Sequence, residues 1–271
     1  MLAPLHFGDV ELLFVLDTAS LMSFADPAVI EQVHSSHVSH PYLIPTRRPR
    51  DDVSATKART GARFATNPAA PLEERSAVSL FRFSLGEIFV HKHRSVILHD
   101  FGHFRAAGLP VYGLVGLDVL SARPVELNFC ANEMRFAASF SSPVQFPEAL
   151  DLGRTRDGFR ELSLRIDQHD VTFLLDSGAS HSYLSAATVQ RVFGNRTPDR
   201  TASLLRADAH GVREPAPMRI FLARSVEIGE ISVQNVEFME GEYNILGMNY
   251  LGQFRWHMDF KRDVVRVATC H

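Results

Sequence analysis

The chain has 271 residues, of which 45% are hydrophobic and 22% are charged, and its formal net charge is −3 at pH 7. This length suits one large domain or two domains of about 130 residues each. The near-balanced charge excludes the basic excess of a nucleic-acid-binding protein and an acidic tail. No apolar run reaches the roughly 18 residues of a membrane span, so we expect neither nucleic acid nor membrane as a partner.

The N-terminus and the two cysteines bear on the cellular compartment. Residues 1–9 lack the basic region and the long apolar stretch of a signal peptide. Cys130 and Cys270 are too few for a disulfide framework or a cysteine-based zinc site. They can form one disulfide, but reduced thiols are the simpler expectation. The sequence therefore predicts a cytoplasmic protein by default, and a periplasmic or secreted one if a leader was removed.

The first half of the chain predicts short strands. An apolar strand over residues 10–16 ends at Asp17, and Asp26 with Pro27 opens a short helix through about His34. Residues 41–79 contain five Pro and little periodicity, so they predict an irregular loop or hairpin. Further strands are expected at residues 78–83, 88–98, 111–120 and 124–129.

The second half repeats this pattern after a Ser- and Pro-rich linker at residues 141–150. Strands are expected at 159–166 and 171–175, and the second of them ends at Asp176. Ser185 is a candidate N-cap of a helix over 186–193 that stops at Gly194. A hairpin tip at 207–212 and strands at 226–233 and 236–238 follow.

Three segments of the first half align with the second half in the same order. Residues 113–129 align without a gap on 244–260, residues 85–88 align on 228–231, and Asp17 aligns on Asp176. Three matches in one order indicate two copies of a β-rich unit, which we place at residues 1–140 and 151–271.

Each copy brings one Asp to the end of an apolar strand. Two carboxylates about 3 Å apart cannot both ionise, so they share a proton and their pKa values separate. One can then act as general base on a water molecule while the protonated one polarises a peptide carbonyl. If the two copies pack about a pseudo-two-fold axis, Asp17 and Asp176 provide this pair.

The second copy resembles the retropepsin-like aspartic peptidases. The resemblance lies in the motifs Asp-Ser-Gly-Ala at 176–179, Ala-x-Gly at 209–211, Ile-Gly at 228–229 and Ile-Leu-Gly-Met-x-Tyr-Leu at 245–251. Residues 10–129 are similar to a second, more diverged copy. The resemblance implies an all-β, bilobal pepsin-like fold with two pseudo-symmetric β-barrel-like lobes, short helices and a long flap insert at about 41–79. It also implies an aspartic endopeptidase that cleaves polypeptides without a cofactor or metal.

The resemblance assigns roles to individual residues. Asp17 and Asp176 become the catalytic pair, and the hydroxyls of Thr18 and Ser177 brace the two loops against each other. Gly178 belongs to the second loop, whereas the first has Ala19 where the family has Gly. The remaining supporting glycines are Gly116 and Gly247 beneath the Asp loops, and Gly61 and Gly211 in two candidate flaps.

Other polar residues have simpler explanations. The 13 histidines include His34, His37 and His40, but no His-Glu-x-x-His pattern accompanies them, so we expect no metal site. Asp118 aligns with Asn249, which indicates a hydrogen-bonding structural residue rather than an acid.

Two alternatives stay open. Ala19 and the irregular insert are compatible with a scaffold or peptide-binding protein that kept the fold after its first lobe lost catalysis. A second alternative is an enzyme that pairs its C-terminal lobe with another copy. In the favoured interpretation both half-sites lie in one chain, so a monomer suffices.

Overall fold

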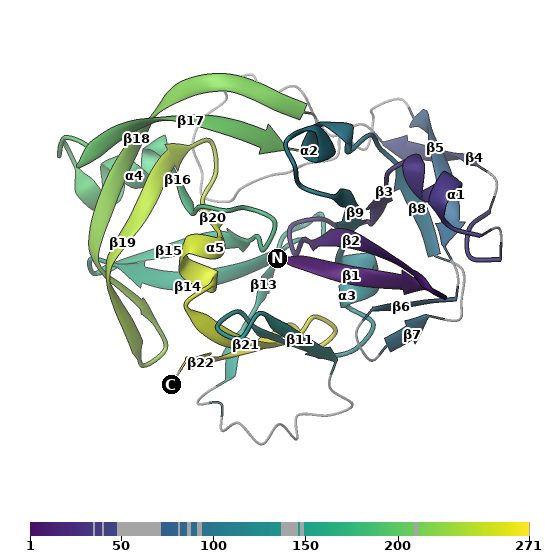
Figure 1. The fold of residues 1–271 in the computed structure, drawn as a ribbon. Helices are drawn as coiled ribbons and strands as arrows, with labels where there is room; N and C mark the ends of the chain where they lie inside the picture. Colours follow the sequence, from purple (N-terminus) through teal and green to yellow (C-terminus); the bar gives the residue numbers. More distant parts are fainter. Residues whose placement is uncertain are drawn as a thin grey trace.

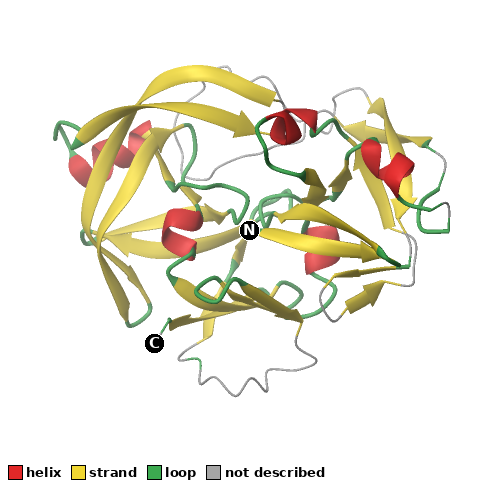
Figure 2. Cartoon of the chain, viewed as in Figure 1, coloured by secondary structure: helices red, strands yellow, loops and turns green. Residues whose placement is uncertain are grey.

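The computed structural model describes residues 1–34, 36–39, 41–47, 72–80, 82–85, 88–90, 94–136, 146, 149–208 and 211–270. Strands dominate these residues, and the longest helix among them has eight residues (Figure 2). Two lobes lie side by side, with a third sheet below and between them (Figure 1). The all-β, two-lobed expectation is confirmed.

The first lobe contains a nine-stranded sheet in the order β4-β5-β8-β3-β9-β2-β1-β6-β7. Its strands are β1 (Leu2–Phe7), β2 (Val10–Leu16), β3 (Phe24–Ala25), β4 (Tyr42–Arg47), β5 (Leu72–Leu80), β6 (Phe83–Leu85), β7 (Ile88–Val90), β8 (Arg94–Leu98) and β9 (Val111–Val115). Its helices are α1 (Ala28–Gln32), α2 (Gly102–Ala106) and α3 (Leu117–Leu120). Helix α1 stops before His34 because Val33 is already extended.

The second lobe contains an eight-stranded sheet in the order β13-β14-β15-β20-β16-β19-β18-β17. Its strands are β13 (Gly153–Arg154), β14 (Arg160–Ile166), β15 (His169–Leu175), β16 (Tyr183–Ser185), β17 (Arg200–Asp208), β18 (Gly211–Ile228), β19 (Ile231–Gly241) and β20 (Ile245–Leu246). Its helices are α4 (Ala186–Phe193) and α5 (Met248–Leu251). Helix α4 has the predicted bounds, with the Ser185 hydroxyl accepting a hydrogen bond from the Thr188 N–H.

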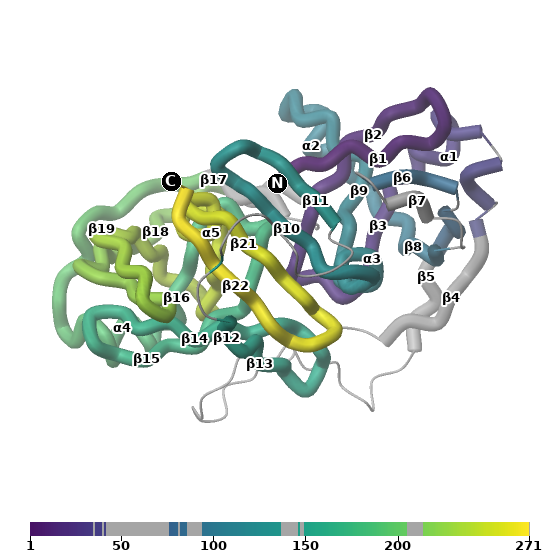
Figure 3. Tube along the Cα trace, turned by 90° about the horizontal axis from the view of Figure 1, so that it is seen from below, coloured from purple at the N-terminus to yellow at the C-terminus, as the bar shows by residue number. Residues whose placement is uncertain are grey.

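A five-stranded sheet joins the two halves of the chain, in the order β11-β10-β21-β22-β12. Its strands are β10 (Val125–Asn128), β11 (Glu133–Phe136), β12 (Ala149–Asp151), β21 (Phe254–Asp259) and β22 (Val264–Thr269). Strand β10 pairs with β21, so this interlobe sheet contains strands from both sequence repeats (Figure 3).

The two lobes have equivalent strand pairings. His6 pairs with Ser84 between β1 and β6, and Arg165 pairs with Glu227 between β14 and β18. Arg165 precedes Asp176 by as many residues as His6 precedes Asp17, and Glu227 and Ser84 each lie directly before the aligned segments 228–231 and 85–88. Strand β9 runs parallel to β2, as β20 runs parallel to β15. The same connections therefore surround Asp17 and Asp176.

Both lobes have an outer pair of antiparallel segments. In the second lobe β18 and β19 form one long hairpin, and β18 also pairs with β14. In the first lobe β5 pairs with β8 and β6 pairs with β7, and β6 also pairs with β1. The strand expected over 88–98 is described at its two ends, as β7 and β8, and residues 91–93 lie outside the described residues.

Alternating burial forms the core. In β14 the side chains of Leu162, Leu164 and Ile166 are buried, while Ser163 and Arg165 between them are exposed. Burying an aliphatic or aromatic side chain of this size contributes about 1.5–3 kcal/mol. Among the described helices, none is long and apolar enough to cross a membrane.

Cys130 and Cys270 form a disulfide, so the expectation of two free thiols is wrong. Cys130 lies in the turn between β10 and β11, and Cys270 follows β22. Their Cα atoms are 5.9 Å apart, within the usual range for a disulfide. The bond therefore links a hairpin of the first repeat to the last strand of the second, at one end of the interlobe sheet.

Candidate active site

The two Asp residues occupy equivalent places in the two lobes. Asp17 follows β2, and its N–H donates to the carbonyl of Val115 at the end of β9 at 3.0 Å. Asp176 follows β15, and its N–H donates to the carbonyl of Leu246 at the end of β20 at 3.1 Å. In each lobe an apolar strand thus ends against a parallel neighbour and turns at the Asp.

Thr18 and Ser177 connect the two turns through four hydrogen bonds. The Thr18 hydroxyl donates to the carbonyl of Leu175 at 2.8 Å and accepts from the Ser177 N–H at 3.0 Å. The Ser177 hydroxyl donates to the carbonyl of Leu16 at 2.8 Å and accepts from the Thr18 N–H at 3.2 Å. Both side chains are 1% exposed. We call these four bonds the latch; because it is reciprocal, it fixes the spacing of the two turns.

The two carboxyl groups meet next to Gly178. They are hydrogen-bonded to each other. A Cβ atom added to Gly178 would lie 2.9 Å from Asp17 Cγ and 3.2 Å from Asp176 Oδ1. Residue 178 therefore lies against both carboxyls, and a side chain at this position would press on them.

The main chain holds the two carboxyls unequally. Asp176 Oδ1 accepts the N–H groups of Gly178 and Ala179, both at 2.9 Å. Asp17 Oδ1 accepts the N–H of Ala19 at 2.8 Å, while the next N–H, that of Ser20, donates to the Asp17 main-chain carbonyl at 3.3 Å. Ala19 therefore supplies the N–H that a glycine would supply, and the first turn has one fewer donor to its carboxyl.

This difference separates the proton affinities of the pair. Burial raises the pKa of both carboxyls, and the nearby charge of Asp176 raises the pKa of Asp17 further. The hydrogen bond between the two carboxyls raises the pKa of Asp17 and lowers that of Asp176. The N–H groups of Ala179 and Gly178 also lower the pKa of Asp176. Asp17 is therefore the member of the pair that keeps a proton to higher pH.

The glycines beneath the turns lie at close backbone contacts. A Cβ on Gly116 would lie 2.6 Å from the Met22 carbonyl oxygen, and one on Gly247 would overlap the His181 carbonyl. Each glycine precedes a short helix, α3 or α5, whose first N–H groups bond to the Asp turn. A larger residue at either position would displace the turn.

The two candidate flaps differ in what the structure describes. Gly61 and most of the predicted insert over 41–79 lie outside the described residues. Gly211 begins β18 and pairs with Asp208 of β17, so it lies at the tip of a hairpin as the sequence predicts. In Figure 1 this hairpin extends across the top of the molecule toward α2.

Residues 162–253 match the family model described as "gag-polyprotein putative aspartyl protease". The matched residues all lie in the second lobe. A solved structure described as a retropepsin-like aspartic protease from Rickettsia conorii is similar over 44% of this chain and 90% of that chain, with 20% identity and a TM-score of 0.34. A comparison with curated proteins finds no match.

The second lobe contains a supporting network that the sequence analysis missed. The Ser182 hydroxyl donates to Asn249 Oδ1 at 2.7 Å and accepts from the Gly247 N–H at 2.9 Å. In the first lobe Ser23 makes the corresponding bonds to Asp118 and Gly116. Each serine lies six residues after its Asp, so the repeat alignment contained the signal that identifies them.

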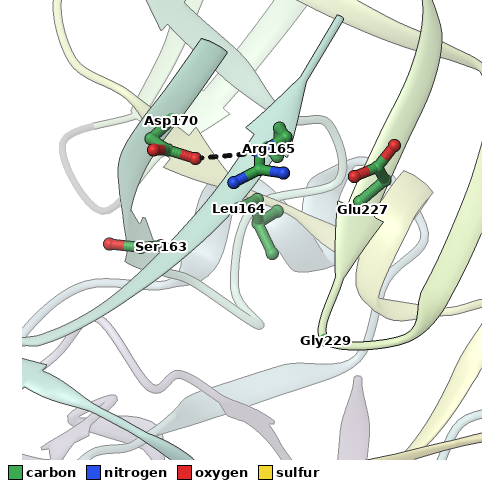
Figure 4. Close-up of a pocket in the computed structure, with 6 residues that line it drawn as sticks. All are labelled: Ser163, Leu164, Arg165, Asp170, Glu227 and Gly229. Carbon is green, nitrogen blue, oxygen red and sulfur yellow. Dashed lines mark hydrogen bonds and ion pairs between the residues drawn. The ribbon is translucent and has the colours of Figure 1, made fainter. Parts of the chain in front are cut away.

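Features away from the Asp pair are weaker candidates. No group of His, Cys, Asp or Glu suited to a metal ion occurs among the described residues, which omit His40, His91 and His93. A pocket of about 210 Å³ lies at the end of β15 opposite to Asp176 (Figure 4). This volume is below the roughly 300–1,000 Å³ of small-molecule sites. Its lining residues are Ser163, Leu164, Arg165, Asp170, Glu227 and Gly229.

Proposed function

We propose that this protein is an aspartic endopeptidase in which Asp17 and Asp176 activate the water molecule that attacks a peptide bond. The observation that carries the proposal is the meeting of the two buried carboxyls, one from each lobe, beside Gly178. Because both carboxyls belong to one chain, a single copy supplies the complete pair.

The unequal proton affinities assign the roles. Asp176, which accepts hydrogen bonds from two N–H groups, is the ionised member. It takes a proton from the water molecule while the water oxygen bonds to the peptide carbonyl carbon. Asp17, the protonated member, gives its proton to the carbonyl oxygen, and a tetrahedral gem-diol forms. Asp176 then gives its proton to the amide nitrogen while Asp17 takes a proton from a gem-diol hydroxyl, the C–N bond breaks, and a carboxylic acid and an amine leave.

The substrate in this proposal is an extended polypeptide. Main-chain pairing with the hairpin of β17 and β18, whose tip contains Gly211, gives general affinity, and alternate side chains enter pockets that provide selectivity. Closure of the hairpin over the peptide also excludes water from the reaction.

The decisive experiment measures cleavage of an unfolded protein from about pH 3 to 7, with and without a statine-type transition-state mimic. The wild type, Asp17→Asn and Asp176→Asn are compared after each is shown to be folded. Cleavage that the mimic inhibits and that both substitutions remove supports the proposal. No cleavage by folded wild type at any pH favours a scaffold that has lost catalysis. Activity that survives Asp17→Asn favours a site built from two copies of the second lobe.

A further inference from the structure

Each active-site turn is supported by a serine that contacts the glycine beneath it. The Gly247 N–H donates to Ser182 Oγ at 2.9 Å, and the Gly116 N–H donates to Ser23 Oγ at 3.0 Å. Both serines are almost completely buried. Up to this point the two lobes have the same arrangement.

The second lobe completes the network with an amide. The Ser182 N–H and hydroxyl both donate to Asn249 Oδ1 at 2.7 Å. The other end of the amide, Asn249 Nδ2, donates to the carbonyl of Glu237 in β19 at 2.8 Å. Asn249 therefore accepts hydrogen bonds from the Asp176 turn and donates one to β19. Its side chain needs both an acceptor and a donor to connect this turn to the strand.

The first lobe has a carboxyl group in this position. The Ser23 hydroxyl donates to Asp118 Oδ1 at 2.8 Å, and the Ser23 N–H also bonds to this carboxyl. Asp118 thus reproduces the acceptor half of Asn249. Its second oxygen, Oδ2, corresponds to the Nδ2 donor of Asn249.

The carbonyl that corresponds to that of Glu237 can be identified from the strand register. The Met239 N–H donates to the Ser182 carbonyl at 3.0 Å, and the Ile97 N–H donates to the Ser23 carbonyl at 3.2 Å. Ile97 is therefore the equivalent of Met239, and Ser95, two residues earlier on β8, is the equivalent of Glu237.

The Ser95 carbonyl points toward this network. Ser95 pairs with Ser79 of β5, whose N–H and carbonyl both bond to Ser39 on the far side of β5. This places Ser79 and Ser95 in a non-hydrogen-bonded pair, so the main-chain groups of Ser95 point away from β5, toward β3. If Asp118 were ionised, its Oδ2 and the Ser95 carbonyl oxygen would both be hydrogen-bond acceptors and could not bond. If Asp118 is protonated, its O–H can donate to the Ser95 carbonyl.

We propose that Asp118 is a positioning residue that acts in its protonated form, with its carboxyl O–H donating to the Ser95 carbonyl and thereby holding the Asp17 turn through Ser23 and Gly116. The inference rests on the proposed function only in that Asp17 is taken to be catalytic. Protonated Asp118 reproduces both halves of Asn249, so the two turns then have equivalent supports.

The surroundings of Asp118 contain opposing influences. Burial raises the pKa of the Asp118 carboxyl, and the bonds from Ser23 lower it by a smaller amount. Arg94 on β8 is the charged side chain that acts on Asp118 most, and it also lowers this pKa. The competing arrangement is an ionised Asp118 paired with Arg94, and it predicts the opposite pH dependence.

The direction in which stability changes with pH follows from the raised pKa of Asp118. Below the ordinary carboxyl value of 3.8 Asp118 is neutral in both the folded and unfolded chain, and its contribution to stability is complete. As the pH rises through the folded-state pKa, ionisation of the unfolded chain is favoured and this contribution is lost. Loss of the proton should loosen the Asp17 turn over the same range.

The test compares the thermal unfolding temperature of the wild type, Asp118→Asn and the matched variant Asn249→Asp across pH 3 to 8. We expect Asp118→Asn to equal the wild type in acid and to unfold about 2–4 °C higher at neutral pH. We expect Asn249→Asp to equal the wild type in acid and to fall below it as the pH rises. The Asp17 and Asp176 pair is present in all three proteins, so differences between them isolate residues 118 and 249.

Three results would overturn the proposal. Asp118→Asn could unfold below the wild type at neutral pH, as loss of an Asp118–Arg94 ion pair requires. Its difference from the wild type could be the same at every pH, or it could fail to fold although the amide has the same shape. If the protein is a peptidase, Asp118→Asn should also move the alkaline limb of kcat to higher pH with KM unchanged. An inactive wild type removes only this last readout and leaves the thermal test intact.

Discussion

The turns after Asp17 and Asp176 follow the same path but hold their carboxyls differently. Asp176 accepts two main-chain N–H groups, whereas Asp17 accepts the single N–H of Ala19. The latch holds both turns by the same pattern of hydrogen bonds, so the two Asp residues occupy equivalent positions. Their carboxyls nevertheless differ in proton affinity. One missing donor thus distinguishes two turns that are otherwise built alike.

The same contrast extends through the lobes. The second lobe has continuous β18 and β19 strands, an Asn249 amide, and the stretch that matches the aspartyl protease family. The first lobe has Asp118 in place of the amide. The two lobes thus differ at the residue that supports the Asp turn.

Removing either carboxyl should have the largest effect on activity. Asp17→Asn and Asp176→Asn should each lower kcat by about 10²–10⁴-fold, because each removes a group that transfers a proton. Steady-state cleavage at the wild-type pH optimum measures the loss. Full activity in either variant would contradict a shared pair.

Removing a carboxyl should lower activity but raise stability at neutral pH. A raised carboxyl pKa contributes stability that is complete below the ordinary value of 3.8 and is lost as pH rises through the folded-state pKa. Asp17→Asn should therefore match the wild type in acid and exceed its unfolding temperature at neutral pH. A uniform difference at all pH values would argue against the raised pKa.

Breaking the covalent link between the repeats should cost stability without changing the carboxyl pair. Cys130→Ser with Cys270→Ser should lower the free energy of unfolding by about 2–4 kcal/mol, because the disulfide closes a long loop. Denaturant unfolding under non-reducing conditions measures it, and reduced wild type is the control. Equal stability of oxidised and reduced wild type would show that the bond does not clamp the interlobe sheet.

The latch tests whether the turns act as one unit. Thr18→Val and Ser177→Ala should each cost about 1–3 kcal/mol, since each leaves buried main-chain groups without a partner. Each substitution removes its own two of the four bonds, so a double-variant loss that differs from the sum of the two measures the coupling between the turns. Thr172→Val, at an exposed hydroxyl pair with Ser163, is the control and should stay within about 0.5 kcal/mol. Additive losses would show that the turns are independent.

Exchanging the small residues that distinguish the turns gives the smallest effects and the sharpest comparison. Gly178→Ala places a methyl 2.9 Å from Asp17 Cγ and should cost about 1–3 kcal/mol by overpacking. Ala19→Gly keeps the N–H that Asp17 accepts and should cost only about 0.5–1 kcal/mol through backbone entropy. Thermal unfolding and kcat of both variants measure this, and a larger loss from Ala19→Gly would reverse our view of the two turns.

Much of this arrangement could be predicted because it is local. Apolar alternation defined the strands that end at Asp17 and Asp176, and Ser185 and Gly194 defined helix α4. The repeat alignment matched Asp17 with Asp176 and residues 85–88 with 228–231, and the strand pairings beside these matches are equivalent in the two lobes. Side chains two residues apart lie on the same face of a strand, so the alternation of apolar and polar residues can be recognised from the sequence alone.

The sequence by itself therefore determined the two repeated units, the strand that leads to each Asp, and the equivalence of Asp118 with Asn249. Only the tertiary structure decided that Cys130 bonds Cys270 and which carboxyl has more donors. These features depend on groups brought together from distant parts of the chain. Their distances and burial, which set bond formation and proton affinity, exist only after the lobes pack.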